Sequence, residues 1–475
     1  MAISDAEFTA WLSSNDRQPV VLLEIDGFRY GGTGAPVTGE ITDYISDRGY
    51  IDPFDSSSPN NYKAQVVSSV TVSDLIGGVL LKPLTIHRPE GYWGPNRTAH
   101  QHRECKVYYG DKRWARSDFR AQITAVMKDS IEEKPLTHRL TFINPADELF
   151  DQVLDPEYYP FLFGECRNIK PKKESATEYV FYHPSDYDFN GISADVSGLT
   201  VGGVTQTEGS DYTLASANEN TDVEKTTITF STAPTLEVAL RGERRTLPNV
   251  LDEINRFLDR PITYNSATFS HLASSDYVAF ALSSSANAKS WINHLFESFG
   301  ANARYNIDGE IEFFVLDEPA TSVLTIREND IRGRLRHVSN DPVVNYLQLR
   351  WWKNWGVQSA SDLDAAYDAS LDPTEEWRVY STATPASELK GSTIIDTLLA
   401  FQTIAHAEGA RRYGLKNTWR NRWKVSTSIR TIELAVGETI TIETDDYDFA
   451  AGEDFVVIGI DKVLTESRCE LRIWK

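Results

Sequence analysis

Three runs near the end of the chain decide the fold class: Gly437-Glu438-Thr439-Ile440-Thr441-Ile442, Asp454-Phe455-Val456-Val457-Ile458-Gly459-Ile460 and Glu470-Leu471-Arg472-Ile473-Trp474. Each run is rich in β-branched and aromatic residues, and the first and last alternate polar with apolar side chains, as a strand with one buried face does. A fourth run of the same kind covers residues 423–429. We therefore predict a β-region over residues 423–474, with the chain ending inside its last strand.

The same pattern of β-branched and alternating residues recurs through the first third of the chain. Alternating and β-branched runs are separated by turn signals such as Gly31-Gly32-Thr33-Gly34 and Gly77-Gly78, which is typical of antiparallel sheet. Before them, residues 5–13 carry Phe8, Trp11 and Leu12 on one helical face. We expect a short helix there and a β-barrel or sandwich over residues 20–165. The runs are residues 20–25, 65–72, 104–109 and 139–143.

Two amphipathic helices are predicted in the middle of the chain, where apolar residues recur every three or four positions. The hairpin of residues 304–314, with Asp308-Gly309 at its turn, is the expected cover for both helices. A longer helix is expected over residues 393–413. The apolar positions are Val250, Leu251, Ile254, Phe257 and Leu258 in the first helix, and Trp291, Ile292, Leu295, Phe296 and Phe299 in the second.

Composition excludes several classes of protein. Lysine and arginine number 47 against 69 acids, a formal net charge of −22, and such a surface repels nucleic acid and anionic lipid. The first eight residues have acids where a signal peptide has bases, and no apolar run approaches the roughly 18 residues of a membrane span. We expect a protein that is made and kept in a cytoplasm. Its binding partners should be proteins, and any DNA near it should be DNA that must not bind to its surface.

No recognisable catalytic motif occurs in the sequence: GxSxG, a P-loop, GxGxxG after a strand, HExxH and an EF-hand loop are all missing. With 69 acids, no pair of carboxylates can be singled out for glycoside hydrolysis. Cys105, Cys166 and Cys469 are far apart and outside any CxxC spacing. His100, His102 and Cys105 could supply three zinc ligands, but a polar loop entering a strand explains them better. We therefore predict no catalytic residue, no metal and no cofactor.

Three tryptophans within five residues, Trp351, Trp352 and Trp355, form the most distinctive cluster. On a strand, Trp351 and Trp355 would share one face and Trp352 would lie on the other. Packing in a core explains such a cluster, and so does a subunit interface, where tryptophan is enriched. We keep both interpretations and name the three residues as a candidate subunit interface.

Residues 411–424 contain six bases and no acid, interleaved with Tyr413, Trp419 and Trp423. Taken alone, such a segment resembles a nucleic-acid patch. Bases at the C-terminal end of a helix also complement its dipole, and they can pair with acidic partners across an interface. The second interpretation suits a protein of charge −22 better. The bases are Arg411, Arg412, Lys416, Arg420, Arg422 and Lys424.

The order of these segments resembles the tail hub proteins of long-tailed phages. As in the first domain of that family, residues 103–111 end in a Gly-Asp turn and lead to Ser117-Asp118-Phe119-Arg120, Leu140-Thr141-Phe142 and a helix at residues 145–150. Residues 160–169 are similar to the family's Gly-x-x-x-Asn segment. The closing part follows the family most closely, with an arginine-bearing helix and strand runs at residues 436–442, 455–460 and 470–474. The family more often has Gly-Asp where this chain has Gly437-Glu438.

The resemblance implies a mainly β fold with α+β insertions, arranged as a multidomain hub with two tail-tube-like β-barrels. Four consecutive domains are expected. Residues 1–170 would form a tube-like β-barrel with a short N-terminal helix, and residues 171–245 an acidic β-rich insertion. Residues 246–320 would form a small α+β domain, and residues 321–475 a second tube-like β domain with a long helix and C-terminal strands.

The resemblance also implies a structural virion protein, a homotrimeric hub at the tail tip that joins the tail tube to a central fibre or spike and encloses the DNA exit channel. Its partners would be its own copies, the distal tail protein, the tape measure protein and the fibre or spike proteins. Phage DNA would pass through without specific binding, and the protein would be synthesised in the host bacterial cytoplasm. The alternative is a tail-associated enzyme that degrades the host envelope, or a carbohydrate-binding module.

Overall fold

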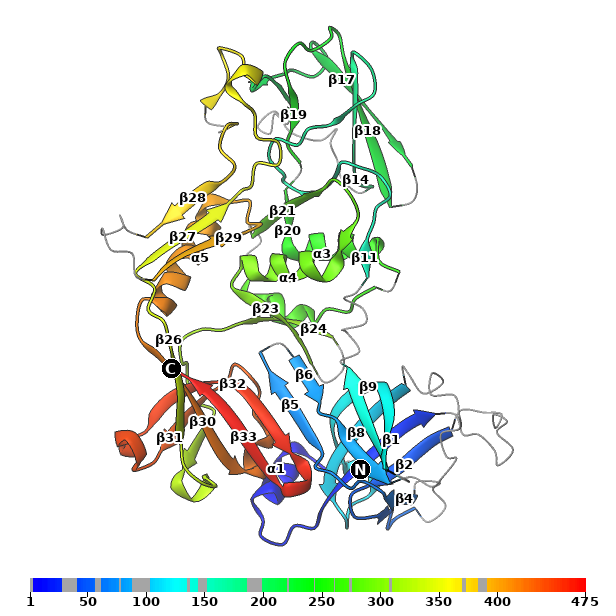
Figure 1. The fold of residues 1–475 in the computed structure, drawn as a ribbon, viewed down its shortest axis with the longest axis vertical. Helices are drawn as coiled ribbons and strands as arrows, with labels where there is room; N and C mark the ends of the chain where they lie inside the picture. The colour runs from blue at the N-terminus through cyan, green and yellow to red at the C-terminus, as the bar shows by residue number, and fades with distance from the viewer. Residues whose placement is uncertain are drawn as a thin grey trace. The chain divides into compact units, whose positions relative to one another are not determined.

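A computed structural model describes residues 3–27, 41–55, 61–76, 78–87, 103–134, 137–143, 152–185, 199–219, 222–242, 244–259, 261–272, 276–306, 310–369, 373–382 and 391–475. The chain divides into two compact units, which we describe one at a time (Figure 1). Unit 1 comprises residues 1–148, 303–341 and 420–475, and unit 2 comprises residues 149–302 and 342–419. Each unit therefore combines segments that lie far apart in the sequence. The four consecutive domains stay a prediction.

The N-terminal segment of unit 1 forms a first barrel. Six strands follow one another in the order β2-β1-β8-β9-β10-β7, each antiparallel to the next, and β4 lies parallel to β2. Just beyond β4, Val66 forms an antiparallel bridge with Ile86 of β7, which closes the row into a ring of seven strands. The bounds are β1 Pro19–Gly27, β2 Ile41–Ser46, β4 Asn61–Ala64, β7 Leu84–His87, β8 Arg103–Asp111, β9 Arg120–Lys134 and β10 Thr137–Ile143, with β3 Tyr50–Ile51 beside β4.

The C-terminal segment of unit 1 forms a second barrel. Strands β31, β32, β33 and β30 are antiparallel neighbours, and β25 lies parallel to β31. Shortly after β25, Ile331 forms an antiparallel bridge with Thr427 of β30, which closes a ring of five strands. β26 continues the sheet beyond β30, and β5 joins it by pairing with β32 and β6. The bounds are β5 Thr71–Leu75, β6 Gly78–Leu81, β25 Leu324–Arg327, β26 Arg336–Asp341, β30 Arg420–Ser428, β31 Thr439–Glu443, β32 Glu453–Val463 and β33 Arg468–Trp474.

Both rings contain one parallel pair for the same geometrical reason. Antiparallel neighbours alternate in direction, so a ring with an odd number of strands needs at least one parallel pair. The pair β4 and β2 fills this need in the first ring, and β25 and β31 fill it in the second. The rings differ in strand number and in the order in which the chain visits the strands. The predicted mainly β fold with two barrels is confirmed.

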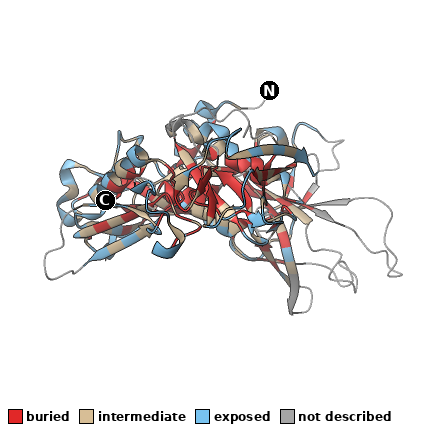
Figure 2. Cartoon of the chain, turned by 90° about the horizontal axis from the view of Figure 1, so that it is seen from above, coloured by how far each residue is buried: buried red, intermediate tan, exposed pale blue. Residues whose placement is uncertain are grey.

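One apolar core serves both barrels of unit 1. It joins inward side chains of the first barrel, such as Val107, with those of the second, such as Leu471. Helix α1 (Asp5–Ser13) adds Phe8, Trp11 and Leu12 to this core, as predicted from the sequence. Figure 2 shows buried residues concentrated in the interior of the strand layers and exposed residues on outer helices and turns.

Unit 2 combines sheets with helices. A seven-stranded sheet has the order β17-β18-β14-β12-β21-β20 with β13 beside β14, and α3 packs on β12, β20 and β21. A three-stranded sheet, β28-β27-β29, is contacted by α5. Smaller sheets are β16-β15-β19 and β11-β22. The bounds are β11 Val153–Leu154, β12 Phe161–Gly164, β13 Lys172–Lys173, β14 Glu178–Pro184, β15 Leu199–Val201, β16 Val204–Thr205, β17 Tyr212–Asn218, β18 Val223–Phe230, β19 Val238–Leu240, β20 Arg245–Thr246, α3 Leu247–Arg256, β21 Tyr277–Leu282, β22 Ala286–Asn287, α4 Ala288–Ser298, β27 Tyr346–Trp351, β28 Arg378–Ser381, β29 Ser392–Asp396 and α5 Gln402–Lys416.

The middle helices form where the sequence predicts them, but both end earlier than expected. Helix α3 ends at Arg256, before the predicted Phe257 and Leu258, and α4 ends at Ser298, before Phe299. Strand β23 (Ala301–Tyr305) pairs with β24 (Ile311–Val315) as the predicted hairpin. The helix predicted over residues 393–413 is wrong in its first part, because residues 392–396 form β29 parallel to β27. The β-branched residues at 393–395 suit a strand, and pairing with β27 prevails over the helical spacing. The helix predicted at residues 145–150 and the turns at residues 31–34 and 308–309 lie outside the described residues.

Candidate functional site

The tryptophan cluster, Trp351, Trp352 and Trp355, lies in unit 2 where β27 ends. Along β27, Leu347, Leu349 and Trp351 are buried while the residues between them are half-buried. Alternate side chains of a strand point to opposite faces, and α5 contacts this strand. Trp351 therefore belongs to the core of unit 2, and it is only 3% exposed.

Trp352 departs from the predicted alternation, because the strand does not continue through it. Its backbone takes a left-handed φ of 46°, and its N–H donates to the carbonyl of Leu399 at 2.8 Å. Trp351 and Trp352 are consequently both buried, with stacked rings whose centroids lie 6.1 Å apart. The expectation that Trp352 opposes Trp351 across a strand is wrong for this reason.

Three guanidinium groups surround the ring of Trp352. Those of Arg378, Arg241 and Arg167 lie 4.5, 4.6 and 5.2 Å from its centroid. A cation over the face of an indole is attracted by the negative face of the ring. These arginines are far apart in the sequence of unit 2, so the ring of Trp352 is a common contact for three separate segments.

Glu165 supplies negative charge beside these arginines. Its side chain is 1% exposed, pairs with Arg241 and accepts a hydrogen bond from Arg244 at 2.9 Å. Its backbone carbonyl accepts the indole N–H of Trp352 at 3.3 Å. The neighbouring thiol of Cys166 is fully buried, and burial raises its pKa, so it stays protonated. The buried carboxylate of Glu165 thus holds Arg241 and Arg244 in place beside Trp352, which is a structural role.

Trp355 differs from the other two tryptophans because its side chain is half-buried. The ammonium group of Lys353 lies 4.7 Å from its ring centroid, and the ring of Trp291 lies 6.1 Å away. A tryptophan of this kind still has surface to offer a partner. The assignment of the cluster to a subunit interface stays a prediction.

The bases of residues 411–424 find acids within the chain. In α5, Arg411 and Arg412 both bind Glu408, and burial lowers the pKa of Arg412 despite that carboxylate. In unit 1, three further bases pair with acids, so little of this segment is available as a free polybasic patch. The acids that were expected across an interface thus come from the same chain. The three pairs are Arg420 with Glu318, Arg422 with Asp341, and Lys424 with Glu470.

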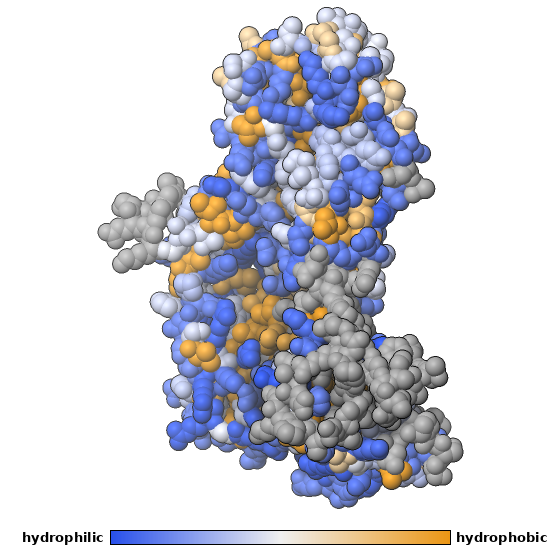
Figure 3. Space-filling model, turned by 45° about the vertical axis from the view of Figure 1, so that its right-hand side comes forward, coloured by the Kyte–Doolittle hydropathy of each residue, from blue (hydrophilic) through white to orange (hydrophobic). Residues whose placement is uncertain are grey.

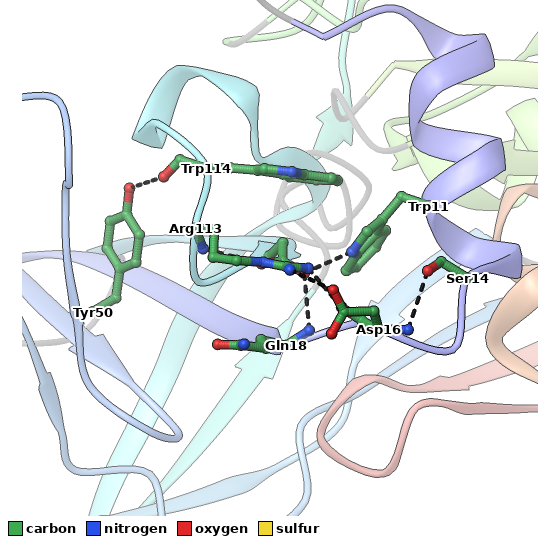
Figure 4. A network of polar contacts seen from close by, with 8 residues as sticks. Trp11, Ser14, Asp16, Gln18, Tyr50, Arg113 and Trp114 are labelled. Carbon is green, nitrogen blue, oxygen red and sulfur yellow. Dashed lines mark hydrogen bonds and ion pairs between the residues drawn. The ribbon is translucent and has the colours of Figure 1, made fainter.

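Asp111, the last residue of β8, anchors α1 to the first barrel (Figure 4). Its fully buried carboxylate accepts the indole N–H of Trp11 at 2.7 Å and the backbone N–H of Gln18 at 2.9 Å. The guanidinium of Arg113 donates to it at 2.7 Å. Burial alone would raise the pKa of Asp111, but these hydrogen bonds outweigh it and lower the pKa to about 2.

The sequence marked Asp111 only as part of a turn. Two of the three residues that donate to it, Trp11 and Gln18, lie 100 and 93 residues away along the chain, and no local spacing in the sequence indicates that they meet it. An acid directly after a run of buried strand residues was the one available signal. On the other side of α1, the hydroxyl of Thr9 donates to Glu433 at 2.6 Å, so α1 contacts both barrels of unit 1.

Sites for metal chemistry are not evident in the part of the chain that the structure describes, which contains no group of three or more His, Cys, Asp or Glu side chains placed to hold an ion. Cys105 is buried in β8, while His100 and His102 lie outside the described residues. A pocket of about 60 Å³ in unit 1 is lined by residues of α1, β25 and residues 430–431. It has room for about two water molecules. Among the described helices, none is long and apolar enough to cross a membrane.

The face in Figure 3 is mostly hydrophilic, with apolar residues in several places. The most exposed large ones are Phe54 at 77%, Trp419 at 69% and Ile51 at 65%. Asp52 accepts the backbone N–H groups of Phe54 and Arg116 at 2.8 and 2.9 Å, so the turn that presents Phe54 is held in place. Scattered residues of this kind are normal on a folded chain.

Comparison with known proteins finds solved structures of similar fold. No family model matches the sequence, and no curated protein sequence matches it. A tail protein from Neisseria meningitidis MC58 is similar over 96% of each chain, with 10% identity and a TM-score of 0.39. The 43 kDa tail protein of prophage MuSo2 from Shewanella oneidensis is similar over 96% of this chain and 98% of its own, with 8% identity and a TM-score of 0.44.

A prophage tail protein from Listeria monocytogenes EGD-e is similar over 86% of this chain and 89% of its own, with 9% identity and a TM-score of 0.42. At these identities the likeness concerns the fold alone. All three structures are tail proteins, the class of protein that the sequence itself resembles.

Proposed function

We propose that this chain is a structural, non-enzymatic component of a phage tail, and specifically the homotrimeric hub at the tail tip. In this role it joins the tail tube to a central fibre or spike and encloses the channel through which DNA leaves. Its neighbours are its own copies, the distal tail protein, the tape measure protein and the fibre or spike proteins. The chain is synthesised in the cytoplasm of the host bacterium and resides in the virion.

The observation that carries this proposal is the pair of closed barrels on one apolar core in unit 1. Two barrels in each of three subunits make six barrels around one axis. The two barrels differ in strand number and strand order, so such a ring would have three-fold symmetry, with six barrels facing the tube and a three-fold face for a fibre or spike. A single-barrel subunit could not adapt one symmetry to the other in this way.

The buried charges also favour a structural role over an enzymatic one. Asp111 accepts hydrogen bonds from three residues and Glu165 binds two arginines, so both carboxylates are already used in holding segments together. General acid–base catalysis requires a carboxyl group within reach of substrate. The low pKa of Asp111, about 2, makes it a poor proton donor at neutral pH.

The net charge of −22 suits a channel that DNA must leave without adhering. Duplex DNA carries one phosphate charge per roughly 1.7 Å, so a basic wall would hold it through many released counterions. We expect acids rather than bases to prevail in the lining, contributed by barrel strands. A tail-tip structure with a central channel lined mainly by Lys and Arg, or with a solid centre, would refute this part of the proposal.

Sedimentation of the full chain at micromolar concentration tests the hub directly. We expect trimers, either of the chain alone or once a neighbouring tail protein is added, with more than about 2,000 Å² buried per interface. Imaging of intact virions should place the chain at the tail tip. A chain that is strictly monomeric inside assembled tails would contradict the proposal.

A further inference from the structure

Three arginines on the second barrel of unit 1 are exposed in a protein that is otherwise strongly acidic. Arg332, Arg334 and Arg336 alternate with Gly333 and with Leu335, which is buried in the core. Burial of Leu335 turns its two neighbours toward solvent, because adjacent side chains of an extended chain point in opposite directions. We call these three residues the arginine edge.

The arginine edge is distinguished by what it does not contact. Its three side chains form no ion pair and no side-chain hydrogen bond with any residue that the structure describes. Every other arginine of residues 303–341 and 420–475 is in an ion pair. Those seven are Arg304, Arg327, Arg420, Arg422, Arg430, Arg468 and Arg472. The unpaired charges are therefore concentrated at one place.

That place is also the end of a sheet. β26 begins at Arg336 and is the last strand of its sheet among the described residues, paired with β30 on one side. Its first five residues are exposed, and Val338 is 62% exposed. A free strand edge next to a row of cations is a surface that can receive another chain.

An acidic segment on the same barrel complements this edge. Asp445, Asp446 and Asp448 surround Tyr447, which is 53% exposed, in the turn between β31 and β32. None of the three carboxylates is in an ion pair within the described part of the chain. Tyr447 and Asp448 have left-handed φ values of 59° and 63°, a conformation that costs residues other than glycine about 1–2 kcal/mol. We call residues 445–448 the aspartate loop.

The two segments lie near one indole without binding each other. His337, beside the arginine edge, contacts the ring of Trp423 at a centroid distance of 5.0 Å, and Tyr447 contacts it at 4.6 Å. No ion pair joins the arginines to the aspartates among the described residues. Three cations and three carboxylates thus stay unpaired, although His337 and Tyr447, which adjoin them in the chain, both contact the ring of Trp423.

We propose that the arginine edge of one copy binds the aspartate loop of a second copy. The three charges on each side are equal in number and opposite in sign, and Tyr447 supplies an amphipathic ring of the kind enriched in interfaces. This inference rests on the proposed function, which already requires several copies in one assembly. It adds the surfaces through which neighbouring copies recognise each other.

Charge reversal in the full chain tests the contact. The triple variant R332E/R334E/R336E should raise the dissociation constant of self-association roughly tenfold or more, because each contact becomes repulsive. The triple variant D445K/D446K/D448K should have the same effect. The chain with all six substitutions should recover self-association, because every contact is again between opposite charges.

A matched control carries K63E/K112E/K128E, which changes the net charge by the same amount at exposed lysines elsewhere in unit 1. It should associate as the wild type does. Association of the wild type should also weaken between about 0.05 and 0.5 M salt, since exposed charges are screened. Circular dichroism of each variant verifies that the monomer remains folded.

The outcomes separate this inference from the hub proposal. If the wild type assembles and the reversed variants assemble equally well, the arginine edge serves only to keep sheet edges apart, and the inference fails while the hub stands. If the chain with all six substitutions does not recover self-association, direct pairing of the arginine edge with the aspartate loop is refuted. A second measurement tests the contact if the purified wild type remains monomeric in solution. The double variant Arg334→Cys/Asp446→Cys, oxidised by dissolved O2, should then give disulfide-linked dimers and trimers in assembled tails, and their absence would overturn the inference as well.

Discussion

The indole N–H of Trp11 donates a hydrogen bond of 2.7 Å to the carboxylate of Asp111, which is completely buried. Trp11 belongs to α1, and Asp111 ends β8 of the first barrel, 100 residues further along the chain. Figure 4 shows Trp11, Gln18 and Arg113 converging on this point from different segments. The contact fixes a short helix that could not be stable alone, because helices under about 12 residues are marginal in water.

Replacing Trp11 by phenylalanine should therefore weaken unit 1. The ring is largely kept, but the indole donor to a charged acceptor is lost, which costs about 1.5–3 kcal/mol. Urea denaturation of the purified chain should show a lower midpoint. The matched control is Trp419→Phe, since Trp419 is 69% exposed and its replacement should change stability by less than about 0.5 kcal/mol. Equal effects of the two substitutions would argue against the anchor.

Asp111 should also give unit 1 a dependence on acid. Its pKa of about 2 in the folded chain lies below the ordinary value of 3.8, so its contribution is present above about pH 4 and is lost as the pH falls toward 2. The difference of pKa corresponds to about 2 kcal/mol. The stability gap between the wild type and Asp111→Asn should be largest above pH 4 and should shrink toward pH 2. A gap that is constant with pH would contradict this assignment.

The tryptophan cluster should separate into core and surface members. Alanine in place of Trp351 or Trp352 should lower the stability of the chain by about 3–5 kcal/mol, because both rings are buried. Alanine in place of Trp355 should cost less stability. If Trp355 anchors a subunit contact, its replacement should instead cost about 2 kcal/mol or more in assembly. Melting followed by circular dichroism, compared with incorporation into tails, distinguishes these results. Normal incorporation of all three variants would exclude the interface interpretation.

Glu165 should be required for the arginine arrangement around Trp352. The substitution Glu165→Gln removes the carboxylate that pairs with Arg241 and Arg244. We expect a loss of about 2–4 kcal/mol, below the full cost of breaking a buried pair, because Arg244 is 46% exposed. The control is Glu174→Gln, which removes an exposed pair with Lys172 and should leave the melting temperature nearly unchanged. Similar melting temperatures for the two variants would show that Glu165 is dispensable.

The closure of the first barrel can be tested at one backbone group. The N–H of Val67 donates to the carbonyl of Thr85 at 3.0 Å beside the closing bridge, while the side chain of Val67 is 59% exposed. Val67→Pro deletes this donor and restricts the backbone of the bridging Val66, and it should cost about 1–3 kcal/mol or more. Val67→Ala keeps the donor and should change stability by less than about 0.5 kcal/mol. Hydrogen exchange should be faster in β4 and β7 of the proline variant, and unchanged protection there would mean that the ring does not depend on this bridge.

Local pattern determined much of the secondary structure. The apolar positions 8, 11 and 12 are contained in one short segment, so α1 could be predicted at its observed bounds, and the structure adds a capping box of Ser4 and Glu7 at its start. The runs at residues 439–442, 454–460 and 470–474 likewise became β31, β32 and β33. In these places the pattern of a few neighbouring residues specifies the helix or strand, and the tertiary contacts are compatible with it.

Contacts between segments decided the structure where the local pattern predicted it wrongly. Residues 392–396 have helical spacing in the sequence, yet β27 offers them a partner strand, and they pair with it. The alternation expected through the three tryptophans stops at Trp351, because the chain turns at Trp352. The β-branched residues at 393–395 are compatible with a strand but do not identify its partner, and the local sequence does not mark the turn at Trp352.

The sequence by itself thus determined the fold class, the acidic character and the position of α1 and of the C-terminal strands, because hydrophobic period and capping act over one or two turns of chain. Only the tertiary structure decided how the rings close at Val66 with Ile86 and at Ile331 with Thr427, and which carboxylates are buried. The physical reason is the range of the interactions. A strand pattern specifies which face is apolar, whereas the partner strand and the donors around Asp111 are fixed by the free energy of the whole assembled core.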